Sequence, residues 1–274
     1  MEIETLIEGL IDDLYEINKA DFAKPKGLGP SWIGHPCGRY IWMKWRGFDA
    51  GNPFDYRDRL GMIFKTGSLL EKLILDSLME AGYKIKQSQD WIRLQSIAGK
   101  IDGILVESGL EYLIEVKSAN DRIFDLVVSK GVKKGKQAWY AQAQLYLRAK
   151  KKELGLLILI NKNNAKIHIE LIRYNTKDAS TFQRRAIAIK NSPELPEMIS
   201  EDQKHSECYF CEFKLPCSSP SGFHQVKKNC GTCVSFEGET MICNNQKNLE
   251  LFDERPVIKD HRKKCKRWDY LFSK

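Results

Sequence analysis

Two short apolar runs near the middle of the chain predict a β-hairpin. The runs are residues 101–106 and 112–116, and the polar, glycine-containing segment 107–109 between them indicates a tight turn. Successive side chains of a strand point to opposite faces. The second run should therefore place Tyr112, Ile114 and Val116 on one face, and Leu113, Glu115 and Lys117 on the other. A carboxylate and an ammonium group thus share a mostly apolar strand.

Other apolar patterns predict helices and strands on both sides of this hairpin. Apolar residues at helical spacing predict helices over 2–19, which should pack one face on the core, and over 58–82. Residues 121–129 and 137–152 are also predicted to be helical. Shorter runs predict strands at 83–88, 91–95, 156–160 and 167–171, the third buried and the last half-exposed. Residues 25–36 should form a loop, 37–46 a short helix, and 176–203 a mostly helical segment interrupted near Pro193 and Pro196.

Asp102, in the middle of the first strand of the hairpin, can reach the same point as Glu115. Charged side chains on an apolar strand are costly to bury unless they are paired or bind a metal ion. Two converging carboxylates repel each other, and a divalent cation removes that conflict. Glu71, on the predicted helix 58–82, is either one more surface carboxylate or a third acidic group that reaches the metal through water. The plain alternative for the hairpin is an edge strand with a surface ion pair.

Composition restricts the class of protein. The chain has 274 residues with 42% hydrophobic content, enough for one large domain or a domain with a small appendage. A net charge of +8 suits a polyanionic partner. The sequence contains no run of 18 apolar residues, so we expect no transmembrane helix. The amino terminus does not have the pattern of a secretory signal. We therefore expect a cytoplasmic, reducing location, in which the eight cysteines indicate metal binding rather than disulfides.

Basic residues occur in two groups beside these elements. Arg39 lies in the predicted helix 37–46, which also carries Lys44 and Arg46, and these cations form either a solvated face or a phosphate contact. Residues 130–136 predict a basic, glycine-spaced loop after the Glu-x-Lys strand and one helix. Most lysine clusters are solvated surface. Next to a candidate metal site, we expect this loop to neutralise phosphates through Lys133, Lys134 and Lys136.

The cysteines divide into two sets of four. Cys37 stands alone upstream, and Cys208-x2-Cys211-x5-Cys217 supplies three further thiolates. Spacing alone does not separate zinc from an iron–sulfur cluster, since both accept four thiolates, and Cys37 has the alternative of being a buried apolar residue. The second set predicts a zinc site, with His261 as a competing ligand; its members are Cys230, Cys233, Cys243 and Cys265.

Taken in order, these motifs resemble the PD-(D/E)XK nuclease superfamily, in particular its RecB-like exonucleases with an iron–sulfur cluster. CRISPR-associated RecB-like nucleases and AddB-type nuclease domains belong to that group. The resemblance covers about residues 31–217, and the motifs that carry it are Cys37, Gly67-x3-Glu71, Asp102…Glu115-x-Lys117, Gln142-x3-Tyr146 and the cysteine triplet. Gln142 and Tyr146 lie one turn apart on the same face of a predicted helix, although Gln144 is an alternative for the glutamine. The cysteine-rich tail resembles extensions on phage-type relatives.

The resemblance implies a fold and a set of roles. The fold would be an α/β restriction-endonuclease-like core, a central mixed sheet flanked by helices, with a small cysteine-rich extension. Asp102, Glu115 and the Val116 carbonyl would bind Mg²⁺ or Mn²⁺, Lys117 would orient the attacking water, and Glu71 would assist at the metal. Gln142, Tyr146 and the 130–136 loop would hold the strand being cut. The first set of cysteines would bind a structural 4Fe–4S cluster, and the second would bind Zn²⁺.

We therefore predict a nuclease domain over 1–217 and a zinc-binding extension over 218–274. The predicted activity is exonucleolytic hydrolysis of DNA phosphodiesters by metal-activated water, in recombination, repair or end processing. The expected partner is DNA, as single strands or duplex ends, together with recombination or CRISPR-adaptation proteins. Two alternatives stay open. One is an endonuclease or end-processing factor of the same fold, and the other is a non-catalytic nucleic-acid-binding or structural metal protein.

Overall fold

The computed structural model describes residues 3–18, 27–48, 56–202, 204–209, 211–218, 236–237 and 242–243. The chain divides into two compact units. The first unit comprises Met1–Gly34 and Phe54–Phe182, and the second comprises His35–Pro53 and Gln183–Lys274. The predicted domain division at residue 217 stays a prediction, because most of 218–274 lies outside the described residues.

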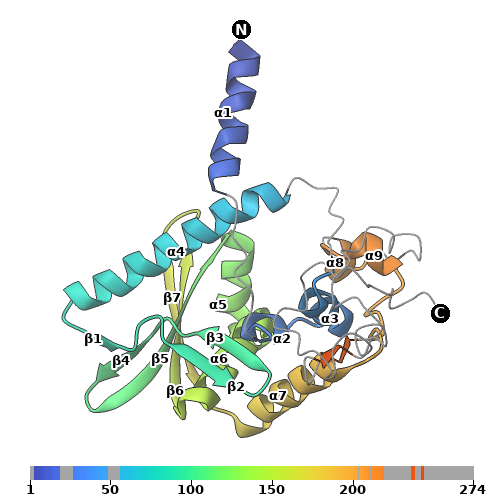
Figure 1. Ribbon diagram of the computed structural model, residues 1–274. Helices are drawn as coiled ribbons and strands as arrows, with labels where there is room; N and C mark the ends of the chain where they lie inside the picture. Colours follow the sequence, from blue (N-terminus) through green and yellow to red (C-terminus); the bar gives the residue numbers. More distant parts are fainter. Residues whose placement is uncertain are drawn as a thin grey trace. The chain divides into compact units, whose positions relative to one another are not determined.

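A five-stranded sheet forms the centre of the first unit (Figure 1). The strands lie in the order β1-β4-β5-β6-β7, and neighbours are antiparallel except for the parallel pair β5 and β6. Their bounds are Lys84–Lys86, Gly103–Glu107, Leu110–Ala119, Leu154–Asn161 and Ile167–Arg173. Two more strands, β2 (Trp91–Leu94) and β3 (Ile97–Lys100), form a separate antiparallel pair. The central sheet is therefore mixed, as the sequence predicted.

Strands β4 and β5 form the predicted hairpin. Glu107 pairs with Leu110, so the turn consists of Ser108 and Gly109, whose φ angles are 50° and 79°. Two-residue hairpin turns of this kind need positive φ at both positions, a conformation that suits glycine. The prediction that Asp102 lies inside the strand is wrong, since β4 begins one residue later at Gly103. Gly103 pairs with Ile114, however, and the same register brings Asp102 beside Glu115.

Helices flank both faces of the sheet. Helix α4 (Tyr56–Glu80) packs on one face through a buried cluster that contains Ile74, Leu75, Leu105, Ile114, Val116, Ile158 and Ile160. Helices α5 (Asp121–Gly135) and α6 (Gln137–Lys150) also contact β5 and β6. Ile114 and Val116 face α4, so Glu115 between them lies on the opposite face of β5. The charge of Glu115 acts on Tyr146 of α6, which lies near that carboxylate. The first unit is thus an α/β fold with a mixed central sheet between helices.

The remaining helices of this unit are α1 (Ile3–Ile17), the single turn α2 (Pro30–Ile33) and the start of α7 (Thr176–Asn191). The unit boundary falls within α7, between Phe182 and Gln183. The segment 176–203, predicted to be mostly helical with an interruption near Pro193 and Pro196, contains α7, which ends at Asn191 before both prolines. Among the helices that the structure describes, none combines the length and apolar character needed to cross a bilayer.

Two predicted apolar faces are more exposed than expected. Helix α1 forms, but the prediction that it packs one face on the core is wrong, since Ile7 is 50% and Leu14 59% exposed. In α4, Ile74 is buried and Leu70 and Leu78 are partly buried, whereas Leu69 is 69% and Leu73 55% exposed. Helical spacing shows that one side of a helix is apolar, but the extent of the sheet beneath it decides how much of that side is covered.

Two predicted loops contain helical structure. The loop 25–36 includes α2, which begins at Pro30, a residue suited to the first turn of a helix. The predicted basic loop 130–136 is wrong, because α5 continues to Gly135 and breaks its helical geometry only at Gly131 (φ 71°, ψ 158°). The next amide, that of Val132, donates to both carboxylate oxygens of Glu170 on β7, at 3.1 and 2.8 Å. That contact replaces the helical partner that the break removes.

The second unit is built from short helices. They are α3 (Gly38–Arg46), the end of α7, α8 (Ser206–Tyr209) and α9 (Lys214–Ser218), and a small strand pair, β8 (Phe236–Glu237) with β9 (Ile242–Cys243), is also described. Helix α3 matches the predicted helix 37–46, and its Trp42 and Trp45 are buried. The Arg46 guanidinium is also buried, lies over the Trp42 ring and donates to the Ser192 carbonyl at 3.0 Å.

Candidate active site and cysteine cluster

The first unit brings together the carboxylates predicted from the sequence. Asp102 is 8% exposed and Glu115 1% exposed. One oxygen of Asp102 accepts a hydrogen bond of 2.7 Å from the Val116 amide, which fixes the carboxyl group against β5. The hairpin register and the alternation of β5 therefore bury two acidic side chains at one point, as expected from the spacing.

Lys117 lies on the same face of β5 and forms an ion pair with Oε1 of Glu115. The Lys117 side chain keeps 22% of its surface exposed, so the ammonium group lies between the buried carboxylate and solvent. Glu115 Oε2 is buried and accepts no hydrogen bond from the described residues. A buried carboxylate oxygen without a donor is costly, and it is the kind of atom that ligates a metal ion.

Electrostatic coupling shows how closely these groups lie. Burial raises the pKa of Glu115 to about 8, because the attraction of Lys117 offsets desolvation only in part and the charges of Asp102 and Glu71 raise it further. Burial likewise raises the pKa of Asp102. Burial alone would lower the pKa of Lys117, but its attraction to Glu115 and then Asp102 raises it overall. The site thus favours a lysine cation and disfavours several bare carboxylates together.

Glu71 belongs to the same group. It projects from α4 and accepts a hydrogen bond of 2.5 Å from Nε2 of Gln89, in the connection between β1 and β2. Burial, followed by the charge of Asp102, raises the pKa of Glu71. The structure therefore places the glutamate of the Gly-x3-Glu motif within electrostatic reach of both other carboxylates.

Helix α6 contributes the glutamine and tyrosine. Gln142 and Tyr146 are both buried, and Gln142 Nε2 lies 3.3 Å from the Tyr146 hydroxyl. Burial and then the charge of Glu115 raise the pKa of Tyr146, which places its ring beside the carboxylates. The Gln142 carbonyl oxygen is buried and has no hydrogen-bond partner among the described residues. This pair therefore adds a hydroxyl group and an uncommitted amide oxygen to the site.

Gln144, the other candidate glutamine, forms its hydrogen bonds with the backbone and not with the carboxylate site. Its amide nitrogen donates to the Arg173 carbonyl and its oxygen accepts from the Asn175 amide, each at 2.8 Å. Both ends of the fully buried side chain therefore bond to the backbone at the end of β7 and just after it. Gln144 holds α6 to the end of the sheet.

The basic residues of 133–136 lie on or just after α5. Lys133 pairs with Asp178 at 2.7 Å and lies over the Tyr140 ring, and Lys136 lies over the Trp139 ring. Lys134 is exposed. The predicted phosphate contacts of these three lysines stay predictions, with Lys133 already held in an ion pair.

The described residues contain no group of three or more His, Cys, Asp or Glu side chains arranged to hold one metal ion. The predicted ligand set does not require such a group, because it combines two carboxylates with a backbone carbonyl. Mg²⁺ is commonly bound by one or two carboxylates and keeps several waters. The unpartnered Glu115 oxygen beside Asp102 fits that donor chemistry.

Sequence reasoning missed the segment 87–91, which lines the same group. Gln89, with a left-handed φ of 57°, contacts Glu71, and the Asp90 carbonyl accepts from the Ile101 amide at 3.0 Å, next to Asp102. Asp90 also pairs with Lys150 on α6. No sequence motif marks this connection. Only its position between two predicted strands, just before the hairpin, indicated that it lies near the site.

The first set of cysteines lies together in the second unit. Cys37, Cys208, Cys211 and Cys217 are free thiols that line one cavity. Burial raises the pKa of Cys211 to about 11, and repulsion from Cys217 and Cys37 contributes. Burial and the neighbouring sulfurs Cys37 and Cys217 also raise the pKa of Cys208. Cys208 and Cys211, whose ionisation is disfavoured, thus share the cavity with two more sulfur donors, and a cationic centre would stabilise their thiolates.

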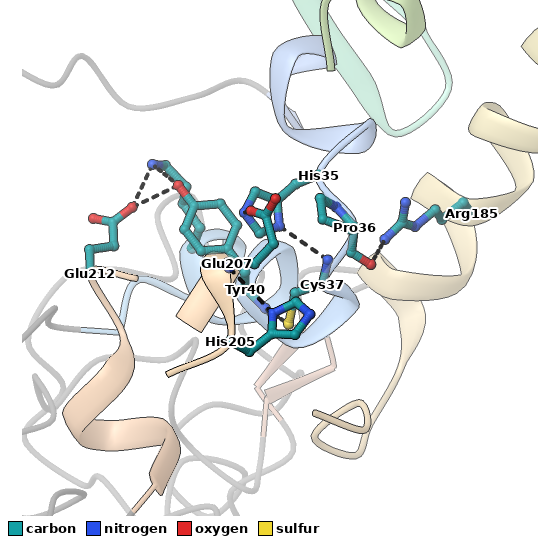
Figure 2. A network of polar contacts seen from close by, with 9 residues as sticks. His35, Pro36, Cys37, Tyr40, Arg185, His205, Glu207 and Glu212 are labelled. Atoms are coloured by element: carbon teal, nitrogen blue, oxygen red, sulfur yellow. Dashed lines mark hydrogen bonds and ion pairs between the residues drawn. The ribbon is translucent and has the colours of Figure 1, made fainter. Parts of the chain in front are cut away.

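Polar contacts hold the backbone around Cys37 (Figure 2). The Cys37 amide donates to Nδ1 of His35 at 3.1 Å, the His35 ring stacks on Tyr40 with centroids 4.1 Å apart, and Arg185 donates to the Pro36 carbonyl at 2.9 Å. Tyr40 in turn donates to Glu212, which also binds Lys44. The segment that carries Cys37 is thereby tied to the segment between Cys211 and Cys217.

Arg39, predicted to contact DNA, belongs to this second site. Its Nε donates to the Pro196 carbonyl at 2.6 Å, and its Nη1 lies 3.7 Å from the Cys217 sulfur. The zinc prediction lies outside the described residues, since Cys230, Cys233 and Cys265 are not among them. Of that set, only the backbone of Cys243 is described, in β9.

Comparisons with known proteins give structural similarities alone. No protein-family model matches the chain, and no curated protein matches it. An alkaline exonuclease (LHK-Exo) from Laribacter hongkongensis is similar with a TM-score of 0.40 and 12% identity, over 60% of this chain and 85% of that one. The protein SSO0001 is similar with a TM-score of 0.44 and 18% identity, over 77% of this chain and 96% of that one.

A phage-related exonuclease from Haemophilus somnus 129PT is similar with a TM-score of 0.35 and 15% identity, over 44% of this chain and 66% of that one. Similarities of this size carry no argument about residue roles. The roles proposed below rest on the geometry of this chain.

Proposed function

We propose that this chain is a DNA nuclease that depends on Mg²⁺ or Mn²⁺ and removes nucleotides from DNA ends. The observation that carries the proposal is the buried Glu115, which lies among two further carboxylates with one oxygen lacking a hydrogen-bond donor. When ionised, Glu71, Asp102 and Glu115 outweigh the single charge of Lys117 by two, and one divalent cation balances that excess. Asp102, Glu115 and the Val116 carbonyl would hold the ion.

The side chains around the ion have separate roles. When bound, such an ion supplies Lewis-acid polarisation of a phosphoryl oxygen and lowers the pKa of water. Lys117, between Glu115 and solvent, orients the attacking water and donates to the phosphoryl oxygens as negative charge develops on them. Glu71 adds negative charge at the ion, and Gln142 and Tyr146 position the DNA strand through their amide and hydroxyl groups.

The proposal predicts a metal-dependent activity with a defined product. We expect the protein to release nucleotides from linear DNA in Mg²⁺ or Mn²⁺, to lose this activity in EDTA, and to regain it when either ion is restored. Covalently closed circular DNA should stay intact, because it has no ends. Release of acid-soluble nucleotides, with gel analysis of the circle, measures both. Cleavage of the circle would replace the exonuclease by an endonuclease, and no cleavage of either DNA would refute the nuclease.

The two glutamines of α6 provide a matched pair of variants. Gln142→Ala removes a group that we assign to DNA, so cleavage should fall about tenfold or more while the melting temperature changes little. Gln144→Ala breaks two buried hydrogen bonds, and it should destabilise the fold by about 1–3 kcal/mol with nearly normal cleavage at 25 °C. Cleavage rates and thermal unfolding of both variants test the assignment. The reverse pattern would show that Gln144 is the residue of the site.

We also propose that Cys37, Cys208, Cys211 and Cys217 bind a 4Fe–4S cluster with a structural role. All four thiols line the same cavity, which supports a shared centre. Four thiolates are the ligand set that a 4Fe–4S cluster takes. The zinc site of Cys230, Cys233, Cys243 and Cys265 stays a prediction from spacing.

A further inference from the structure

The strand pair β2–β3 is attached directly to the carboxylate site. Gln89, two residues before Trp91, donates to Glu71, and the Asp90 carbonyl accepts from the Ile101 amide beside Asp102. At the other strand, the Lys100 amide bonds to the Tyr146 hydroxyl. The first residue of β2 and the last residue of β3 therefore lie at the rim of the site, within two residues of groups that line it.

Trp91 and Lys100 face each other at this rim. They are paired across the two strands, and the Lys100 Nζ lies 5.3 Å from the centroid of the Trp91 ring. The alternation of β2 buries Ile92, and it leaves Trp91 49% exposed with Arg93 on the same side. Asp90, the adjacent acid, is neutralised by Lys150. A large aromatic surface is thus presented to solvent with Lys100 beside it and Arg93 on the same face of β2.

We propose that Trp91 and Lys100 form a binding subsite for one unpaired nucleobase and its phosphate. The base stacks on the Trp91 ring, and Lys100 binds the adjoining phosphate. Aromatic rings stack with every base, because each base has a π-face, and an adjacent cation binds the backbone. The inference rests on the proposed nuclease function for the identity of the polymer. It adds that the polymer reaches the carboxylates as a single strand.

Trp91 is not needed to fill the core beneath the strand pair, since half of its surface is exposed. The opposite face of the strand pair already carries the buried Ile92 and Ile97. Gly99, between Ala98 and Lys100, has the Tyr146 hydroxyl within 2.8 Å of where a Cβ would lie, so the backbone of β3 is held tightly against the site. A rigid strand pair carries the aromatic ring, as a stacking platform requires.

Binding in EDTA tests the subsite without any cleavage. The probes are a fluorescein-labelled dT12 and a 12-mer of the same charge that lacks bases, followed by fluorescence anisotropy with the full chain. Trp91→Ala should weaken binding of dT12 about tenfold or more and leave the base-free 12-mer unchanged, and Trp91→Phe should keep most of the affinity. Lys100→Ala should weaken both probes and lower the salt slope by about 0.7. Tyr83→Ala, an exposed aromatic in the turn before β1, is the matched control and should change neither.

Two results would overturn the subsite. The first is binding of dT12 by Trp91→Ala as tight as that by the wild type, which would exclude stacking. The second is an equal loss of affinity for both probes, which would assign the effect to charge or fold; the melting temperature of Trp91→Ala separates these two causes. Failure of the nuclease proposal is a different result, because a protein that cuts no DNA would still show the base-dependent loss if the subsite is real.

Discussion

Replacement of Lys117 by alanine is expected to lower the rate of DNA cleavage about 1,000-fold or more. Among the residues that the structure describes, the Lys117 ammonium group is the cation paired with the buried Glu115, and it extends from that carboxylate towards solvent. Loss of a single group that stabilises developing charge or orients a reactant commonly costs between about 100-fold and 10,000-fold. Cleavage of linear DNA under single-turnover conditions measures the effect on the chemical step.

The fold should survive this change. Without Lys117, the Glu115 carboxyl group loses its counter-ion and takes up a proton, since burial already raises its pKa to about 8. Circular dichroism and thermal unfolding should therefore stay close to those of the wild type. Lys84→Ala, which removes an exposed lysine from the edge strand β1, is the matched control and should keep full activity. If Lys117→Ala cut DNA at the wild-type rate, the assignment of the site would be wrong.

Replacement of Cys37 by serine is expected to remove the iron and lower the melting temperature by about 10 °C or more. Cys37 caps α3 by accepting the Tyr40 amide at 3.4 Å, and serine is a favourable cap residue, so this variant keeps the cap and removes a metal ligand. Metal binding to thiolates contributes many kcal/mol to folding, and about 3 °C corresponds to each kcal/mol in a chain of this size. Iron analysis, visible absorption and thermal unfolding of anaerobically purified protein measure the loss.

The same preparation also distinguishes iron from zinc. The wild type should be coloured and carry about four irons at this site, as a 4Fe–4S cluster requires. A colourless wild type that holds zinc at these thiols would refute the cluster and leave the nuclease proposal untouched. Retention of all the iron by Cys37→Ser would show that Cys37 is a helix cap and not a ligand.

The sequence predicted the hairpin and its charged face well, because both depend on local rules. The period of two in a strand places Glu115 and Lys117 on one face whatever surrounds them, and the turn at Ser108-Gly109 sets the register that brings Asp102 alongside. The same period placed Ile114 and Val116 together on the opposite face, and the structure shows that this face packs on α4. Local periodicity was therefore sufficient for the centre of the site.

Features that depend on contacts between residues far apart in the sequence could not be predicted from local patterns. Gln142 and Gln144 both lie on α6, and only the backbone at Arg173 and Asn175 shows that the second one is committed. Lysines and glycines in 130–136 favoured a loop, whereas the Glu170 carboxylate stabilises the break and lets α5 continue. Gln89 and Trp91 reach the site through a turn whose left-handed residues carry no sequence signal.

The most direct test of the central claim is hydrolysis of linear DNA in Mn²⁺ by the wild type and by Asp102→Asn, side by side. The substitution removes one charge at the proposed metal site while it conserves the volume of a side chain that is 8% exposed. The account predicts rapid release of nucleotides by the wild type and a loss of about 1,000-fold or more in the variant, with both proteins folded. Equal rates for the two proteins, or a wild type that is inert in both Mg²⁺ and Mn²⁺, would contradict it.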